Sequence, residues 1–273
     1  MFEMKKRNLI IMAALFTFTI GIASVHAKSN SEIKSEDLDS FTTVEAKVNT
    51  SNINIVKGDK YKIEIDYRQP KEKINYKVKN NKLIINTKRK WSIFPEFGPQ
   101  PYNVITVYAP DIENVKFNSK SGDFLLDSFK ISELSVGTIS GDIELEDSNV
   151  QKIYVKTTSG DMNIKSSKLQ DVNVSTVSGD IKLETSDMQK VAIKTTSGDL
   201  DIYDVRIKDI NTATISGDIN MNLVEQSNLK LKSVSGTIKI DGKIYEREYN
   251  EDNSFGSNIN VKSSSGDITI THR

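Results

Sequence analysis

A Ser-Gly dipeptide recurs at every nineteenth position from Ser121 to Ser235, and this fixed interval sets the strongest limit on the fold. In seven of its eight copies the next residue is aspartate, and Thr237 is the exception. A period of about 20 residues is typical of repeat proteins, in which each unit buries its apolar face against neighbouring units. The final copy follows after a longer gap. The copies begin at Ser121, Ser140, Ser159, Ser178, Ser197, Ser216, Ser235 and Ser265.

The unit Ser140–Thr158 shows how one repeat folds. Ile143 and Leu145 alternate with glutamates, a polar turn follows, and the alternation resumes at Ile153 and Val155. This period of two is typical of strands with one buried face, and β-branched residues dominate without any helical spacing, so we predict an all-β fold. Two strands and two turns in each 19-residue repeat form one coil of a parallel β-helix or β-solenoid, with equivalent strands paired at about 4.8 Å.

The sequence constrains handedness and coil length less firmly. Right-handed crossovers are the default for parallel strands, so we expect a right-handed solenoid. A coil twice as long, with two repeats in each circuit, is also compatible with the pattern.

The Ser-Gly-Asp turn has a structural explanation in every coil. Glycine permits a backbone angle that other residues resist, and serine and aspartate can hydrogen-bond the turn backbone locally. A hydroxyl residue before each turn, such as Thr138, points inward and could hydrogen-bond from coil to coil. We therefore assign the turn a structural role. Its column contains Gly122, Asp123, Gly141, Asp142, Gly160, Asp161, Gly179, Asp180, Gly198, Asp199, Gly217, Asp218, Gly236, Gly266 and Asp267.

The chain divides into four parts. Residues 1–27 are predicted to be a cleaved secretory signal, because a basic start and the apolar run Leu9–Ala23 precede small residues at Val25–Ala27. That run is shorter than the ~20 apolar residues of a membrane-spanning helix. Residues 28–40 are expected to be a polar linker and 41–120 a strand-rich N-terminal cap of irregular coils. Residues 121–273 form the solenoid, with an inserted loop at about 242–256.

Charge and cysteine content exclude several classes of protein. Without residues 1–27 the chain has 34 basic and 36 acidic residues, so we expect no cluster of Lys and Arg of the kind that binds nucleic acid. It contains no cysteine. This excludes thiolate metal sites and an acylated cysteine anchor, and an exported product would depend on its core rather than on disulfides.

Two segments outside the repeats carry a candidate binding patch. Lys88–Phe97 combines a basic run with the only tryptophan, and the insertion after Gly242 is rich in tyrosine and glutamate. Exposed aromatics beside cations could contact a membrane interface, an anionic polymer or a protein. The alternative, which we favour, is that the aromatics of the first segment cover the end of the core. The patch residues are Arg89, Trp91, Phe94, Phe97, Tyr245 and Tyr249.

Catalysis has little support in the sequence. Parallel β-helices host polysaccharide-cleaving enzymes that use carboxylate clusters, but an aspartate in every coil is what a turn requires, whereas a catalytic site breaks the repetition at one place. After residue 27 the single histidine is His272, which disfavours histidine acid–base or zinc chemistry. We predict no enzyme activity and no catalytic, cofactor-binding or metal-binding residues. Structural calcium along the aspartates is the one ligand of this kind left open.

The repeat Ser-Gly-Asp-apolar-x-apolar, preceded by a strand-rich segment that ends Val104–Pro110, resembles the DUF4097 family of bacterial β-strand repeat proteins. The resemblance covers essentially the whole chain after the signal. Members are described as candidate adhesins, and the resemblance implies an exported or surface-exposed β-solenoid. Some relatives are linked to cell-envelope stress responses, and no catalytic residues come with the resemblance.

Together these observations predict a non-enzymatic secreted or cell-surface module of the bacterial envelope. Its expected partners are an envelope or host-surface polymer or protein, with peripheral membrane contact and no nucleic acid. A further expected partner is a second copy, joined through an exposed final strand at Asp267–Thr271. The alternative function is an extracytoplasmic sensor or regulator of envelope stress, and a polysaccharide-active β-helix enzyme ranks third.

Overall fold

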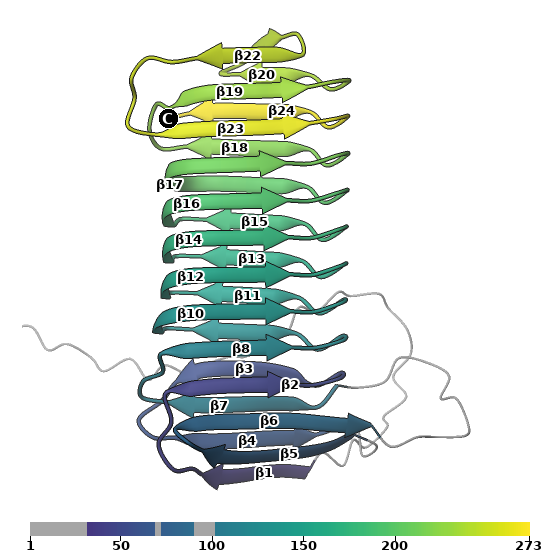
Figure 1. Ribbon diagram of the computed structural model, residues 1–273, viewed down its shortest axis with the longest axis vertical. Helices are drawn as coiled ribbons and strands as arrows, with labels where there is room; N and C mark the ends of the chain where they lie inside the picture. Colours follow the sequence, from purple (N-terminus) through teal and green to yellow (C-terminus); the bar gives the residue numbers. More distant parts are fainter. Residues whose placement is uncertain (1–31, 69–71, 90–101) are drawn as a thin grey trace, which may run out of the picture. The chain divides into compact units, whose positions relative to one another are not determined.

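The computed structural model describes residues 32–68, 72–89 and 102–273, which form strands and turns without a helix (Figure 1). The predicted signal at 1–27 and the patch residues Trp91, Phe94 and Phe97 lie outside these ranges. No helix capable of crossing a membrane occurs in the three ranges. The prediction of an all-β fold is confirmed.

The strands form two sheets that enclose one apolar core. In spatial order, sheet A contains β1 (Glu32–Asp37), β4 (Lys62–Tyr67), β7 (Val104–Ala109), β3 (Asn52–Lys57), β9 (Phe124–Asp127), β11 (Ile143–Glu146), β13 (Met162–Lys165), β15 (Ile181–Glu184), the first part of β17 (Leu200–Ala213), β18 (Ile219–Leu223), β24 (Ile268–His272), β20 (Ile238–Ile240) and β21 (Lys243–Tyr245). Sheet B contains β5 (Glu72–Lys79), β6 (Lys82–Arg89), β2 (Thr43–Lys47), β8 (Asn114–Asn118), β10 (Lys130–Gly137), β12 (Asn149–Lys156), β14 (Lys168–Ser175), β16 (Asp187–Lys194), the second part of β17, β23 (Asn258–Ser263), β19 (Asn228–Ser233) and β22 (Glu248–Glu251).

From β9 to β18 the strands stack in parallel, and each strand from β9 to β16 pairs with the equivalent strand of the next repeat. Ile143 lies beside Phe124 on one side and Met162 on the other, so neighbours in the ladder are equivalent positions of successive repeats. The same positions of each repeat turn inward, and their side chains are almost fully buried. The core is therefore a set of apolar columns that run from coil to coil, as predicted for a β-solenoid.

The strands of residues 43–109 close one end of the stack. β2 and β3 form a first coil that pairs with β8 and β9. On its other side, β6 pairs with β2 and β7 pairs with β3, and the antiparallel strands β5 and β4 follow. Asn80 and Asn81, with φ angles of 51° and 60°, form the two-residue turn between β5 and β6.

The prediction of a polar linker over residues 28–40 is wrong for β1. This strand pairs antiparallel with β4 through six residue pairs. All six of its side chains are exposed, so the sequence carries no alternation of buried and exposed residues that would reveal a strand. β1 covers the edge of β4, which would otherwise be open to pairing with another chain.

At the other end the order of the strands in space departs from their order in the chain. β19 and β20 continue the regular spacing of the repeat, yet their parallel neighbours are β23 and β24. β23 lies between β17 and β19, and β24 lies between β18 and β20 (Figure 1). The expectation that the strand at Asp267–Thr271 is exposed is therefore wrong, because β24 is paired along both of its edges.

The insertion predicted as a loop at 242–256 forms two short strands. β21 pairs antiparallel with β20, and β22 pairs antiparallel with β19. Asp241 and Gly242, with φ angles of 45° and 82°, form the two-residue turn into β21. The two strands cover edges of the stack that need partners, and residues 252–257 then connect β22 to β23.

Close packing requires glycine at the Ser-Gly-Asp corner. A Cβ atom on Gly160 would lie 1.9 Å from the carbonyl oxygen of Gly141, far inside van der Waals contact, and the same clash recurs along the column. The glycine with a left-handed φ among the described residues is Gly242, which is not in the column. The prediction that the corner glycines supply an unusual backbone angle is therefore wrong.

The corner aspartates and threonines make different hydrogen bonds from those predicted. Oδ1 of Asp142 accepts the backbone N–H of Asp161 in the next coil at 3.0 Å, and this bond recurs along the column. Oγ1 of the buried Thr157 accepts the N–H of Gly160 in its own coil at 3.0 Å. The aspartates therefore join successive coils, and the threonines close the turn.

The corner on the opposite side of each coil uses non-glycine residues with left-handed φ angles between 45° and 66°. Beside them, Ser167 is buried; its Oγ accepts the N–H of Ser148 at 3.2 Å and donates to the carbonyl oxygen of Lys165 at 2.8 Å. This serine position thus also links neighbouring coils. The left-handed residues are Ser128, Asp147, Ser166, Thr185 and Asp204.

We predict that Gly160→Ala destabilises the protein by about 3 kcal/mol or more, because the added methyl group meets a backbone carbonyl of the adjacent coil. Gly256→Ala is the matched control, since no atom lies within 4 Å of the position its Cβ would take. Urea unfolding followed by circular dichroism measures both variants. Equal stability of the two would contradict the close-packing explanation.

Candidate functional site

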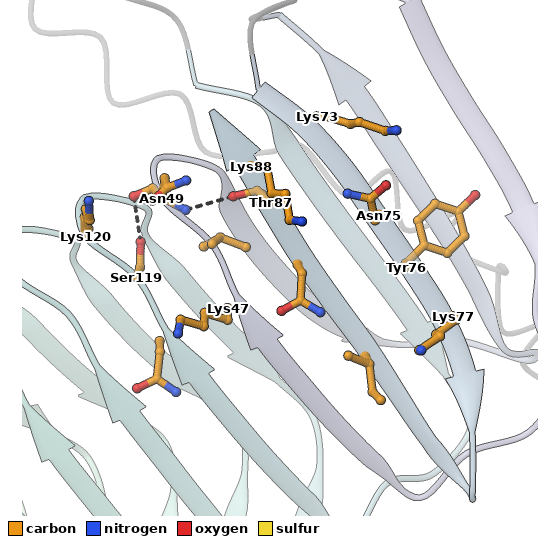
Figure 2. Close-up of a pocket in the computed structure, with 14 residues that line it drawn as sticks. Lys47, Asn49, Lys73, Asn75, Tyr76, Lys77, Thr87, Lys88, Ser119 and Lys120 are labelled. Carbon is orange, nitrogen blue, oxygen red and sulfur yellow. Dashed lines mark hydrogen bonds between the residues drawn. The ribbon is translucent and has the colours of Figure 1, made fainter. Parts of the chain in front are cut away.

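A groove of about 690 Å³ lies on sheet B over β5, β6, β2 and β8 (Figure 2). Strand alternation explains its composition. On β5, Ile74 faces the core while Lys73 and Asn75 face outward, and β6 presents Asn86 and Lys88 in the same way. The hairpin of β5 and β6 therefore supplies one wall of polar and basic side chains.

The strand register brings residues from four strands into one row. Asn86 of β6 lies opposite Asn75 of β5 and beside Lys47 of β2. Lys47 is in turn beside Asn118 of β8. The row offers three amides and one ammonium group on neighbouring strands, and it exists because β2 lies between β6 and β8.

The groove is positively charged. Five lysines and no acidic residue line it, and none of these lysines forms an ion pair with a carboxylate of the described residues. Glu45, which precedes Lys47 on the outer face of β2, is bound by Lys82 at 2.8 Å, and this hydrogen bond lowers the pKa of Glu45. Such a groove attracts anions. Its lysines are Lys47, Lys73, Lys77, Lys88 and Lys120.

A buried carboxylate anchors the strands beside the groove. Glu72, only 2% exposed, accepts hydrogen bonds from Ser51 Oγ at 2.7 Å, from Thr50 Oγ1 at 3.0 Å and from the hydroxyl of Thr87. Burial raises the pKa of Glu72, but the hydrogen bonds outweigh burial and its pKa is lowered. The backbone N–H of Asn49 also donates to Thr87 Oγ1, at 2.9 Å (Figure 2). These bonds fix β5 and β6 against the corner that precedes β3.

The first part of the predicted binding patch continues from the strand that lines the groove. Arg89 ends β6, where its backbone is in register with Glu72 of β5. Trp91, Phe94 and Phe97 follow in the sequence and lie outside the described residues.

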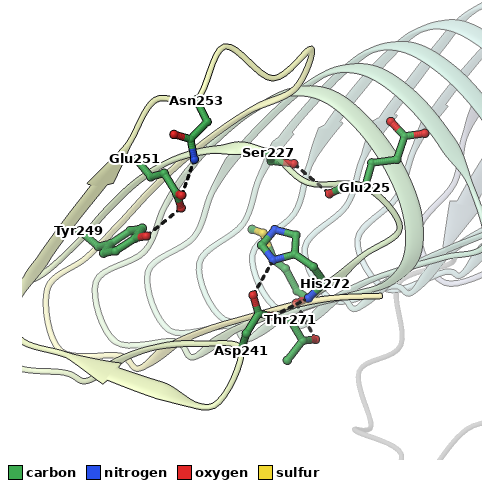
Figure 3. A network of polar contacts seen from close by, with 9 residues as sticks. Glu225, Ser227, Asp241, Tyr249, Glu251, Asn253, Thr271 and His272 are labelled. Atoms are coloured by element: carbon green, nitrogen blue, oxygen red, sulfur yellow. Dashed lines mark hydrogen bonds and ion pairs between the residues drawn. The ribbon is translucent and has the colours of Figure 1, made fainter.

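The second part of the predicted patch lies at the other end of the strand order. Tyr245 on β21 and Tyr249 on β22 are half-buried against the core, with ring centroids 4.5 Å apart. Tyr249 donates its hydroxyl to Glu251 at 2.7 Å, and this bond raises the pKa of Tyr249 to about 12 (Figure 3). Sheet B begins with β5 and ends with β22, so the structure does not bring these tyrosines to the groove.

The sequence prediction missed most of the groove. The alternation of Lys73, Asn75 and Lys77 with Ile74 and Tyr76 was a usable signal, because polar residues at every second position define the outward face of a strand. Nothing in the sequence shows that Lys47 and Asn118 lie on the neighbouring strands. That placement comes from the strand order, which the repeat does not encode in this region.

The column of corner aspartates is not arranged as a metal site. Across residues 32–68, 72–89 and 102–273, no group of three or more His, Asp or Glu side chains could hold a metal ion. The column aspartates instead use Oδ1 to accept a backbone N–H from the neighbouring coil. The groove therefore remains the candidate binding site.

Parallel coils with antiparallel strands at both ends define the protein as a capped β-solenoid. The family model described as Toastrack DUF4097 matches residues 41–271. The chain therefore belongs to this family, as the repeat indicated.

Several solved structures share the fold. A candidate adhesin from Parabacteroides distasonis has a TM-score of 0.56 and 12% identity, with 90% of this chain and 98% of that chain covered. A candidate adhesin from Parabacteroides merdae has a TM-score of 0.54 and 14% identity, with 90% and 97% covered. A candidate lipid-binding protein from Parabacteroides distasonis has a TM-score of 0.53 and 17% identity, with 90% and 98% covered. No curated protein is similar to the chain.

We predict that Glu72→Gln lowers the free energy of unfolding by about 1–2 kcal/mol at neutral pH, because one buried and two half-buried hydroxyl donors lose a charged acceptor. The pKa of Glu72 in the folded protein lies below its ordinary value of 4.5. The carboxylate therefore stabilises the fold above about pH 4.5, and this contribution is lost as the pH falls through the lower folded value.

Thermal unfolding of both proteins between about pH 3 and pH 7 measures this effect. The melting temperatures should differ at pH 7 and converge in acid. Glu133→Gln, at an exposed position on β10, is the matched control and should melt like the unaltered protein at each pH. A gap for Glu72→Gln that stays constant down to pH 3 would contradict the role of its charge.

Proposed function

We propose that this protein is an exported, non-enzymatic binding module whose basic groove holds an anionic polymer of the cell envelope or of a host surface. The observation that carries this proposal is the lining of the groove, which has five lysines, four asparagines and no acidic residue. The predicted signal at residues 1–27 supports export. The names of structural relatives, two candidate adhesins and a candidate lipid-binding protein, support binding rather than catalysis.

The chemistry of the groove suits a polymer with phosphate or carboxylate groups. Ammonium groups act as flexible point charges for such anions. The amides of Asn75, Asn86 and Asn118 can donate to and accept from the hydroxyl groups of a sugar or polyol backbone. Both kinds of group project from paired strands, so the protein orders little of its backbone on binding, and the entropy cost falls mainly on the lysine side chains.

The proposal also fits the openness of the site. A polymer must enter and leave at its sides, and a groove across four strands allows this, whereas an enclosed cavity would select a small molecule. Contacts between exposed charges are individually weak and are screened by salt. We therefore expect moderate affinity that depends on several lysines together.

Binding to poly(glycerol phosphate) tests the proposal. We predict that Lys73→Glu/Lys77→Glu/Lys88→Glu weakens binding by about tenfold or more, since each exposed contact contributes up to about 1 kcal/mol. Affinity of the unaltered protein should fall as the salt concentration rises. Isothermal titration calorimetry at two salt concentrations measures both effects.

The matched control is Lys156→Glu/Lys168→Glu/Lys194→Glu, which makes the same change of charge at exposed positions of β12, β14 and β16. This variant should keep most of the affinity. Equal loss in both variants would show a general charge effect and would overturn the assignment of the groove. Binding that is insensitive to salt would exclude the proposed electrostatic mechanism.

A further inference from the structure

The β23–β24 pair occupies a slot inside the stack. β23 shares five residue pairs with β17 and six with β19, and β24 shares five with β18 and three with β20. Between the two sheets, Ile259, Val261, Ile268 and Ile270 are almost fully buried. The pair therefore contributes to the core like an ordinary coil, although it enters from a later part of the chain.

The slot can close without breaking the repeat. Ser235 follows Ser216 at the usual interval, so β19 and β20 have the spacing to stack directly on β17 and β18. Leu229 would then lie beside Ile210, and Gly236 would meet Gly217 at the corner. The inserted arrangement instead places Lys262 beside Lys232, and like charges on paired strands repel.

Polar groups are poorly satisfied around the same slot. Among the described residues, six buried side-chain polar atoms have no hydrogen-bond partner. Four of them lie on the inserted pair or on the strands that form its walls, and buried atoms of this kind are costly to leave unpaired. These four are Thr212 Oγ1, Asn222 Oδ1, Asn260 Oδ1 and His272 Nε2.

The connection into the slot has the features of a hinge. Residues 252–257 join β22 to β23, and Asp252, Asn253, Ser254 and Gly256 are exposed. Ser254 has a φ of 60°, and no atom lies within 4 Å of the position of a Cβ on Gly256. A change of backbone direction here would disturb little apolar packing, and its main cost would be the four hydrogen bonds that join Asn228 of β19 to Asn253, Phe255 and Ser257.

Beyond the hinge, specific bonds hold the far end of the inserted pair. The backbone N–H of His272 donates to Oδ1 of Asp241 at 2.8 Å, and the ring Nδ1 lies 3.1 Å from Oδ2 (Figure 3). Asp241 belongs to the turn between β20 and β21. The slot therefore recognises the pair by side-chain contacts as well as by backbone ladders.

We propose that two copies of this chain exchange their β23–β24 pairs when they fold together, so that each pair fills the slot of the other copy. The partner is a second copy because its pair carries the same four inward residues and the same contact to Asp241. Reciprocal exchange satisfies both slots and forms a closed dimer. The alternative stacking of β19 on β17 lowers the cost of an empty slot while the exchange takes place.

Disulfide trapping in the full chain tests this proposal, because the natural sequence has no cysteine. Asn220 and Thr269 are partners in the ladder between β18 and β24, at a separation suited to a disulfide. Asn220→Cys and Thr269→Cys are made in separate chains of different mass, mixed, refolded together from denaturant and oxidised. If the pairs exchange, the yield of the mixed disulfide-linked dimer should be at least ten times the yield of a dimer between two copies of either variant alone.

The matched control pair is Lys156→Cys and Ser175→Cys, which are ladder partners on β12 and β14 in the middle of the stack. These chains should give no mixed dimer above random collision. The double variant Asn220→Cys/Thr269→Cys should form its disulfide within one chain when refolded at high dilution, which shows that the geometry permits the bond. Mixed dimer no greater than in the control pair, while the double variant does form its bond, would overturn the proposal.

Discussion

At each Ser-Gly-Asp corner, the carbonyl oxygen of one glycine lies against the Cα of the glycine in the next coil, where a Cβ atom would otherwise be. The rest of the stack depends on this close contact between glycines. A separation of about 2 Å between that oxygen and any Cβ leaves glycine as the only residue that fits. The contact fixes one coil over the next, so that each aspartate meets the following backbone N–H. With the register fixed, the inward apolar positions fall into columns and the core becomes continuous.

A parallel stack has open edges at both ends, and this protein covers them with antiparallel strands. β1, β4 and β5 serve one end, and β21 and β22 serve the other. The groove is a consequence of the first cap, because the hairpin of β5 and β6 extends sheet B beyond the repeats. Its outward face is free of the turn requirements that govern the repeats, so lysine and asparagine can gather there. The repeats therefore form the rigid stack, whereas the candidate binding groove lies on the N-terminal strands outside the repeats.

The sequence predicted the β-solenoid and its inward columns because those features recur in every unit. It did not predict which units are neighbours in space. The 19-residue spacing continues unbroken from Ser216 to Ser235, which suggests that Gly236 packs against Gly217, but in the structure Gly236 packs against Gly266. Thr237, which replaces the corner aspartate, was the one sign of the altered order. Its backbone N–H donates to Asp267, but the next strand in space is the antiparallel β21, so no further coil offers an N–H for a carboxylate at position 237 to accept. At the other end Ser51 takes the glycine position and donates to Glu72. These two exceptions can be explained only when the strand order is known. The groove, too, can be predicted only from the strand order, because its lining comes from neighbouring strands that are distant in the sequence.

The placement of β23 and β24 has a consequence for the time course of folding. A solenoid that grows by adding coils at one end completes itself step by step, and its rate reflects local contacts. In this chain the strands that form the second cap precede the pair that lies beneath them. Growth can therefore reach the cap before the stack is complete. The final step is then insertion of the β23–β24 pair between β17–β18 and β19–β20. The slowest event should be the separation of these strands, whatever number of coils the protein contains.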